Sequence, residues 1–276
     1  MIPIYIVSRA TERMSTPGIL AASGVNHFVV VDDSVQAARV RKVSDFCHPL
    51  VCPCSDLVAK RNWITKYHKE MHERGQESGP WYIGMDDNIQ AFTTVRSDYY
   101  DNDTVRADDG NNWRPVFNCE TDPWIYINEL NKMCKQMSEI NAPYGGVATM
   151  ENPFFRMKKY SYRRFVKTKV FIMDASANMM FKHSMCHDSY MTALAIARNG
   201  LVLVNNFLFY KARWYEKGGI GDRKAREAAG LLTQLQECCD EFPGLVAMAR
   251  GKNSALRVCK VHDTSIDKWR KEHGWL

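Results

Sequence analysis

The segment WYIGMDDNI (residues 81–89) joins a short apolar run to two aspartates and an asparagine. The run from Trp81 to Met85 has the length and apolar character of a buried strand, and Asp86, Asp87 and Asn88 follow it directly. Polar side chains at the carboxyl end of a buried strand are typical of α/β proteins that bind a ligand at this edge. Asp-Asp-Asn is also favourable turn chemistry, so a simple polar turn is the alternative.

Earlier apolar runs end in the same manner. One ends at Ser8 and Arg9, and another ends at Asp32 and Asp33. Helical segments separate the apolar runs, over residues 17–23, 34–43 and 61–74, and a further run occupies residues 49–54. Strands that alternate with helices at this spacing predict a parallel, doubly wound sheet. We therefore expect the polar side chains at the strand ends to converge on one edge of the sheet.

The second half of the chain is less regular. Residues 187–199 predict an amphipathic helix that ends at Gly200, and Gly145–Gly146 predict a bend within a strand. Other elements are expected over residues 122–140, 144–148, 169–172, 201–204 and 223–239. The pattern predicts an α/β fold: one domain over residues 1–225 with a Rossmann-like, doubly wound sheet, and a C-terminal helical extension over 226–276.

Composition agrees with a folded protein of the cytoplasm. The chain has 276 residues, of which 45% are hydrophobic and 25% charged, enough for a sizeable core. No apolar run reaches the ~18 residues of a membrane span, and the short apolar N-terminus lacks the basic region of a signal peptide. The nine cysteines are odd in number and irregularly spaced, which favours reduced thiols over a disulfide framework.

Two groups of cysteine and histidine residues are potential metal ligands. Cys47, His48, Cys52 and Cys54 lie within eight residues, but no second pair with zinc-site spacing follows. Buried thiols in a strand and its turn are the favoured interpretation, and zinc is the alternative. His68 and His72 are spaced four apart without the glutamate of HExxH, and we expect these histidines at the surface.

Asp86 and Asp87 are stronger candidates for a metal site than these cysteines and histidines. Two adjacent carboxylates that face one cleft repel each other, and a divalent cation relieves that repulsion. Hard oxygen ligands suit Mg²⁺ or Mn²⁺, which would bridge to the phosphates of a nucleotide. The sequence therefore predicts Mn²⁺ or Mg²⁺ at this strand end.

Charge is distributed unevenly along the chain. Residues 86–122 contain nine acidic and three basic residues, whereas RMKKYSYRRFVKTK (residues 156–169) contains seven basic residues and no acid. Cations bind phosphates and aromatic rings stack on exposed bases, so this segment is a candidate nucleic-acid contact, apart from the acidic strand ends. The alternatives are a solvated surface or an anion patch for a diphosphate alone. The candidate contacts are Lys158, Lys159, Tyr160, Tyr162, Arg163 and Arg164.

The chain resembles GT-A glycosyltransferases, whose DxD-like element follows the fourth strand as DDNI does here. The order VSR, RNW, MDDNI, HD and GGIG is similar to a narrower group, the TET-associated glycosyltransferases of phages, relatives of the base J glucosyltransferase of kinetoplastids. The resemblance covers residues 1–225, with a nucleotide-binding half over 1–90 and an acceptor half over 91–225. It implies a GT-A-type fold, in which the doubly wound sheet is mixed. Two departures are Asn88 at the third DxD position and the absence of the late metal-binding histidine after Val204.

The resemblance assigns roles to individual residues. Asp87 would ligate the metal, with Asp86 beside it and the ribose, and Asp188 at a helix N-terminus would be the catalytic base. An N-cap is the alternative role for Asp188, and His187 is an alternative base. The donor nucleotide would contact Ser8, Arg9, Asp32, Arg61 and Asp86, and a loop containing Lys217, Gly218 and Gly219 would cover the diphosphate.

These roles imply an inverting, metal-dependent transfer of glucose or a related hexose from a UDP-sugar. The acceptor would be the hydroxyl of 5-hydroxymethylcytosine or 5-hydroxymethyluracil in DNA, flipped out or single-stranded, in the host-cell cytoplasm if a phage encodes the protein. Three alternatives stay open: a GT-A glycosyltransferase acting on a protein or glycan, a sugar nucleotidyltransferase using the same aspartates, and a DNA-binding module without activity.

Overall fold

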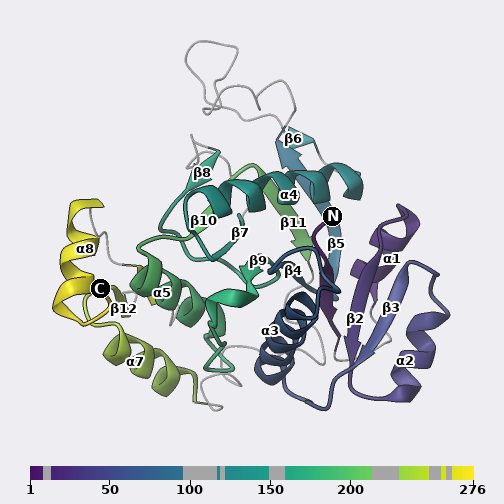
Figure 1. The fold of residues 1–276 in the computed structure, drawn as a ribbon, viewed down its shortest axis with the longest axis horizontal. Helices are drawn as coiled ribbons and strands as arrows, with labels where there is room; N and C mark the ends of the chain where they lie inside the picture. Colours follow the sequence, from purple (N-terminus) through teal and green to yellow (C-terminus); the bar gives the residue numbers. More distant parts are fainter. Residues whose placement is uncertain are drawn as a thin grey trace, which may run out of the picture.

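The computed structural model describes residues 1–8, 14–95, 117–118, 122–148, 159–212, 230–248, 256–258 and 263–276. Figure 1 shows α1, α2, β2 and β3 at one end of the molecule and α5, α7 and α8 at the other. An eight-stranded sheet runs between the two ends, and β5, β6 and β11 form a separate, smaller sheet.

This central sheet has eight strands and is mixed, as predicted. Its order is β3 (Cys47–Val51), β2 (His27–Val31), β1 (Ile4–Val7), β4 (Trp81–Asp86), β9 (Val170–Asp174), β7 (Tyr144–Val147), β10 (Leu203–Asn205) and β8 (Tyr160–Ser161). The first four strands are parallel, whereas β9 is antiparallel to both of its neighbours, β4 and β7. The start of β9 therefore lies at the carboxyl end of β4.

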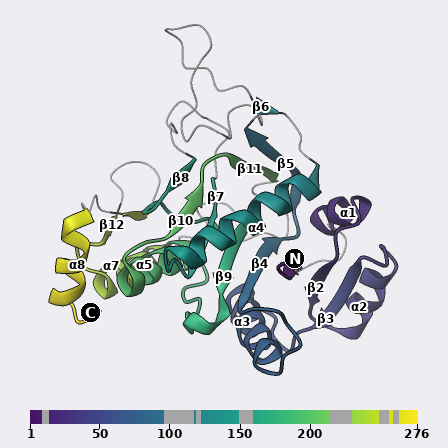
Figure 2. The ribbon, with the colours of Figure 1, turned by 45° about the horizontal axis from the view of Figure 1, so that its top comes forward.

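Helices cover both faces of the sheet. In β1, Tyr5 and Val7 belong to the core that includes Ile64 of α3 (Leu57–Glu73) and α5 (His187–Asn199), and the alternate residues Ile4 and Ile6 face the opposite core. That second core contains α1 (Ser15–Ala22) and α4 (Pro123–Glu139), and α2 (Ser34–Arg41) packs on β2. Figure 2 shows the same layers from another side. The period of two in β1 thus produces the doubly wound, Rossmann-like architecture.

A second sheet was not predicted. β5 (Ile89–Val95) begins one turn after β4 and pairs with β11 (Leu208–Ala212) and β6 (Phe117–Asn118). The Asp-Asp-Asn segment was interpreted as the end of an element, but after a two-residue turn the chain continues directly as a strand. Ile89, Phe92 and Leu208 fill the same core as α4, so this sheet lies against the central one.

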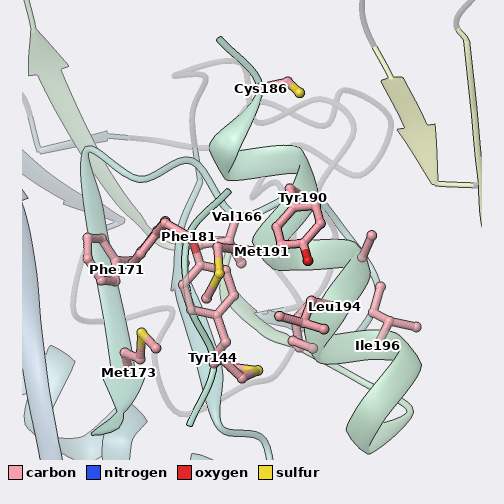
Figure 3. Packing of buried hydrophobic residues seen from close by; sticks show 14 of the residues in the cluster. Tyr144, Val166, Phe171, Met173, Phe181, Cys186, Tyr190, Met191, Leu194 and Ile196 are labelled. Carbon is pink, nitrogen blue, oxygen red and sulfur yellow. The ribbon is translucent and has the colours of Figure 1, made fainter. Parts of the chain in front are cut away.

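The C-terminal region contains a hairpin as well as helices. Its elements are α7 (Leu231–Glu241), β12 (Val246–Met248), β13 (Leu256–Val258) and α8 (Asp263–Glu272). The predicted helix over 223–239 begins at Leu231 here, and residues 223–229 lie outside the described residues. Leu235 and Trp269 share one core with Leu194 of α5. Figure 3 shows that core, with Tyr144 between Met173 of β9 and Leu194.

Two expectations were wrong. The predicted Gly-Gly bend is a regular strand, since β7 pairs with β9 and β10 through both glycines and neither glycine has a positive φ. His68, expected at the surface, is fully buried on α3, where Nδ1 lies 3.1 Å from the hydroxyl of Tyr5. The face of α3 that carries His68 packs on the sheet. The apolar residues of this helix are widely spaced, so the sequence did not indicate which face is buried.

Among the described residues, Cys47, His48, Cys52 and Cys54 do not come together as a group of metal ligands. Cys47 and Cys52 are buried, and the Cys47 Sγ lies 3.2 Å from Nε2 of the buried His27. Burial raises the pKa of both thiols, so they stay protonated. His48 points away and lies 3.2 Å from the Asn26 side chain. Within the described ranges no helix is long and apolar enough to cross a membrane.

Gly145 gives a prediction for the fold. A Cβ there would lie 2.6 Å from the carbonyl oxygen of Leu203 in β10, which backbone pairing holds in place. Gly145→Ala should lower the free energy of unfolding by about 1 to 3 kcal/mol in urea denaturation. Gly79→Ala is the matched control, because nothing lies within 4 Å of its Cβ position. Equal stability of the two variants would contradict the close approach of β7 and β10.

Candidate functional site

The carboxyl ends of β1, β2 and β4 meet at one edge, as predicted. The Ser8 hydroxyl donates to Asp87 Oδ2 at 2.9 Å. The buried Lys60 Nζ donates to the Ser8 carbonyl at 2.7 Å and lies 2.5 Å from Asp32 Oδ1. Polar groups from three strands and from α3 therefore form one connected cluster, which we call the strand-end cluster.

The Asp87–Asn88 pair forms the turn between β4 and β5. The Thr16 hydroxyl of α1 donates to the Asp86 carbonyl at 2.7 Å and accepts from the Ile89 amide at 2.9 Å. The Thr16 amide also donates to the Asp87 carbonyl at 3.1 Å. The polar-turn interpretation is therefore correct for the backbone, and the same turn presents the aspartate side chains to the strand-end cluster.

Arg61 supports Asp86 from inside the protein. Its side chain is 1% exposed and donates to Asp86 Oδ1 at 2.8 Å, while its other nitrogen donates to the Thr168 hydroxyl at 2.7 Å. The rings of Phe171 and Phe181 lie 5.7 and 5.5 Å from the guanidinium. Burial alone would raise the pKa of Asp86, but Arg61 and Lys169 lower it, so the carboxylate is charged.

Lys169 lies beside the same carboxylate. Its Nζ lies 2.8 Å from Asn88 Oδ1 and 3.4 Å from Asp86 Oδ2, and its carbonyl accepts from the Asp86 amide at 3.0 Å. The basic segment was expected to lie apart from the acidic strand ends. For Lys167 and Lys169 that was wrong, because the antiparallel β9 starts where β4 ends.

Asp188 lies in the first turn of α5. The N-cap is Cys186, so the N-cap alternative for Asp188 was wrong. Asp188 Oδ2 accepts from Lys167 Nζ at 2.7 Å, and Oδ1 accepts from the Ser189 amide at 2.8 Å. Burial would raise the pKa of Asp188, but Lys167 and these hydrogen bonds lower it to about 2. The carboxylate is therefore a weak base as long as Lys167 contacts it.

His187 is a buried link rather than an exposed base. Its Nδ1 lies 3.0 Å from the Ser184 carbonyl, which can only accept, so Nδ1 carries the proton. Nε2 then accepts from the Thr168 hydroxyl at 2.9 Å. Burial and the nearby Arg61 lower the pKa of His187 to about 4, so the ring is neutral at pH 7. The hydrogen bonds connect Asp86, through Arg61 and Thr168, to the start of α5.

The described side chains do not fit a chelating metal site. Asp86 already contacts Arg61 and Lys169, and Asp87 accepts from Ser8. Nowhere in the described ranges do three or more His, Cys, Asp or Glu side chains form a group that could hold a metal. The Mn²⁺ or Mg²⁺ expected from the sequence therefore stays a prediction, and no step below depends on it.

The candidate nucleic-acid residues differ in accessibility. Tyr162 is 47% exposed and Arg164 is also exposed. Lys159 contacts Glu129 at 3.4 Å and lies over the ring of the half-buried Tyr160, and Arg163 donates to the Gly200 carbonyl at 3.3 Å. Lys158 lies outside the described residues, as do the donor-site candidates Arg9, Lys217, Gly218 and Gly219.

Sequence reasoning missed five of these site residues. Thr16 and Lys60 are polar residues in helices, where solvent exposure is the usual expectation. Lys167, Thr168 and Lys169 were included only in the extent of the basic segment. Their position directly before the strand 170–174 was the available signal, but its use required knowing that the strand is antiparallel to β4.

No known protein-family profile matches the chain, and no curated protein matches it. Among solved structures, the chain is similar to CMP:2-keto-3-deoxy-manno-octonic acid synthetase complexed with CTP. The alignment has 10% identity, a TM-score of 0.38, and covers 84% of this chain and 98% of that one. A TM-score this low carries no argument about function.

The buried histidines predict how stability depends on pH. His68 and His187 have folded pKa values of about 4, below the usual ~6.5, so only the unfolded chain takes up these protons between those values. The free energy of unfolding should fall as pH drops through this window, by roughly 2 kcal/mol per histidine at pH 5. Urea denaturation at pH 7.5 and pH 5.0 measures this fall.

His187→Gln should reduce the fall by one histidine's share, because Gln does not titrate. The amide can also retain one of the two hydrogen bonds, which limits the loss of folding. An unchanged pH dependence in this variant would show that His187 is not buried in the neutral form.

Proposed function

We propose that this protein transfers a sugar from a nucleotide sugar to an acceptor hydroxyl, as a glycosyltransferase of the GT-A type. One observation supports it most. The segment Lys167–Lys169 lies between two carboxylates, and its lysines contact Asp86 on one side and Asp188 on the other. Glycosyl transfer needs a donor-phosphate site beside a base, and this arrangement provides groups for both.

The strand-end cluster would hold the donor nucleotide. Asp32 and Asp87 are only partly buried and have oxygens that can accept from sugar hydroxyls. Lys60 and Ser8 fix these carboxylates in place, which lowers the entropic cost of binding. Arg61 would act through Asp86 rather than by contact with the ligand, because its side chain is buried.

Asp188 would be the base. The acceptor oxygen attacks the anomeric carbon, the bond from that carbon to the diphosphate oxygen breaks, and the proton of the hydroxyl passes to Asp188. The nucleoside diphosphate leaves with the electron pair, and the configuration inverts. Because Lys167 holds the pKa of Asp188 at about 2, Lys167 would have to move away before the carboxylate accepts a proton.

DNA that contains 5-hydroxymethylpyrimidines is the acceptor we propose, by resemblance to the TET-associated group. Tyr162 and Arg164 are the exposed members of the basic segment and could stack on a base and contact a phosphate. A protein or glycan acceptor is the alternative. A sugar nucleotidyltransferase would use the same aspartates, but it would release pyrophosphate rather than UDP.

The test is release of UDP from UDP-glucose and other UDP-hexoses in the presence of duplex and single-stranded DNA. The DNA would carry 5-hydroxymethylcytosine, 5-hydroxymethyluracil or no modification. UDP release that depends on the hydroxymethyl group supports the proposal. UDP release with a peptide or glycan but not with DNA would show that the acceptor is a protein or glycan. Release of pyrophosphate from an NTP would show that the protein is a nucleotidyltransferase.

The proposed base predicts a separation between binding and chemistry. Asp188→Asn should leave the UDP-sugar dissociation constant within about twofold and lower kcat by roughly 100-fold or more, because the amide cannot accept a proton. Calorimetry and UDP-release kinetics measure the two quantities. If the variant instead loses donor affinity and keeps kcat, Asp188 belongs to the donor site and the base lies elsewhere.

The proposed acceptor predicts a specific salt dependence. Arg164→Glu should weaken DNA binding and reduce the slope of log affinity against log salt by about 0.7 to 0.9, the value for one phosphate contact. Tyr162→Ala should weaken binding without changing the slope, since stacking releases no counterions. Electrophoretic titration at several salt concentrations measures both effects.

Arg74→Glu is the matched control for charge reversal, because Arg74 is 64% exposed at the far end of α3. It should leave the affinity and the slope at the wild-type values. A wild type without salt-dependent DNA affinity would exclude the DNA acceptor in favour of a protein or glycan.

A further inference from the structure

The ammonium group of Lys169 lies beside the DxD-like element, where the sequence predicts a divalent cation. It lies 2.8 Å from Asn88 Oδ1 and 3.4 Å from Asp86 Oδ2, two of the oxygens of the DxD-like element. The side chain is only 13% exposed, so it is not a mobile surface lysine. Both oxygens belong to the strand end and its turn, and Asp86 is one of the two aspartates that the sequence offers as metal ligands.

The backbone determines where this lysine lies. Val170 pairs with Met85 in the sheet, and the Lys169 carbonyl accepts from the Asp86 amide at 3.0 Å. Lys169 is thus fixed one residue before β9, directly beside the last residue of β4. The backbone of Lys169 cannot leave the DxD-like turn without breaking strand pairing, whereas its side chain can still rotate.

Among the described residues at this edge of the sheet, the formal charges balance without a metal ion. The carboxylates are those of Asp32, Asp86 and Asp87, and the cations are Lys60, Arg61 and Lys169. Carboxylate pairs need a divalent cation when no other positive charge neutralises them. Here the chain supplies that charge, because Arg61 lies on the buried side of Asp86 and Lys169 lies on its open side.

The two contacts of Asp86 are unequal. Arg61 lies 2.8 Å from Oδ1 in the buried interior, and Lys169 lies 3.4 Å from Oδ2. Arg61 therefore keeps Asp86 neutralised when Lys169 turns toward a ligand. An ammonium that can change partner in this way suits a phosphate, which accepts strong charge-assisted hydrogen bonds.

We propose that Lys169 is the resident cation for the donor diphosphate, and that the site binds a nucleoside diphosphate without a divalent metal. The inference rests on the proposed function, because it assumes a nucleotide donor. Lys169 Nζ would donate to the diphosphate oxygens and stabilise the charge that develops on the leaving group. Metal-dependent binding through Asp87 is the rival outcome.

The experiment is calorimetric titration with UDP, in EDTA and in Mn²⁺, for the wild type and Lys169→Met. The wild type should bind UDP with affinities within about threefold in the two buffers, and Lys169→Met should lose about tenfold or more in EDTA. Lys69→Met is the matched control, because Lys69 Nζ also contacts an asparagine oxygen at 2.7 Å and a carboxylate at 3.8 Å. It should bind UDP as the wild type does.

Lys169→Arg keeps the charge and should retain most of the affinity, which separates lost charge from lost folding. A wild type that binds UDP only with Mn²⁺ would overturn the proposal, as would unchanged binding by Lys169→Met. Pyrophosphate is the second probe. If pyrophosphate binds through Lys169 but no nucleotide binds, the diphosphate site is supported and the proposed nucleotide donor is rejected. If UDP binds equally well without Lys169, the nucleotide donor is supported and the role of Lys169 is rejected.

Discussion

The buried guanidinium of Arg61 is the interaction on which the rest of the site depends. Its charge is buried beside two phenylalanine rings, where a cation without a counter-ion would be unfavourable, and the carboxylate of Asp86 makes its burial tolerable. Its second partner is Thr168, in the segment that precedes β9. One side chain of α3 therefore fixes the end of β4 and the residues that precede β9, and through His187 it reaches the start of α5.

The antiparallel direction of β9 explains why opposite charges alternate across the site. In a wholly parallel sheet, the residues before a strand lie at the edge away from the ligand. Here Lys167, Thr168 and Lys169 come before β9 yet lie at the ligand edge, between Asp86 and Asp188. Because this one strand is antiparallel, basic residues that are distant in the sequence lie among the carboxylates of the site.

The local sequence pattern was sufficient to predict the first strands of the central sheet and one helix of the second half. The strands that end at Ser8, Asp32 and Asp86, and the helix 187–199, were predicted to within a few residues, since alternation and Gly200 are local signals. Strand direction is not local, so the position of Lys169 could not be predicted. The partners of Lys60 and Arg61 depend on the face that α3 buries, and β5 was missed because a two-residue turn separates it from β4.

The helix that carries Asp188 is held at both ends, and this has a consequence for biosynthesis. His187 is bonded to Thr168 at one end, and at the other Arg270 of α8 donates from Nε to the Ala197 carbonyl at 2.9 Å and also contacts the Arg198 carbonyl. Arg270 is made 73 residues after Ala197. While the ribosome is still adding those residues, the last carbonyls of α5 lack this partner, and the core that contains both Leu194 and Trp269 is incomplete. The contacts at the end of α5 can therefore form only after α8 has been synthesised.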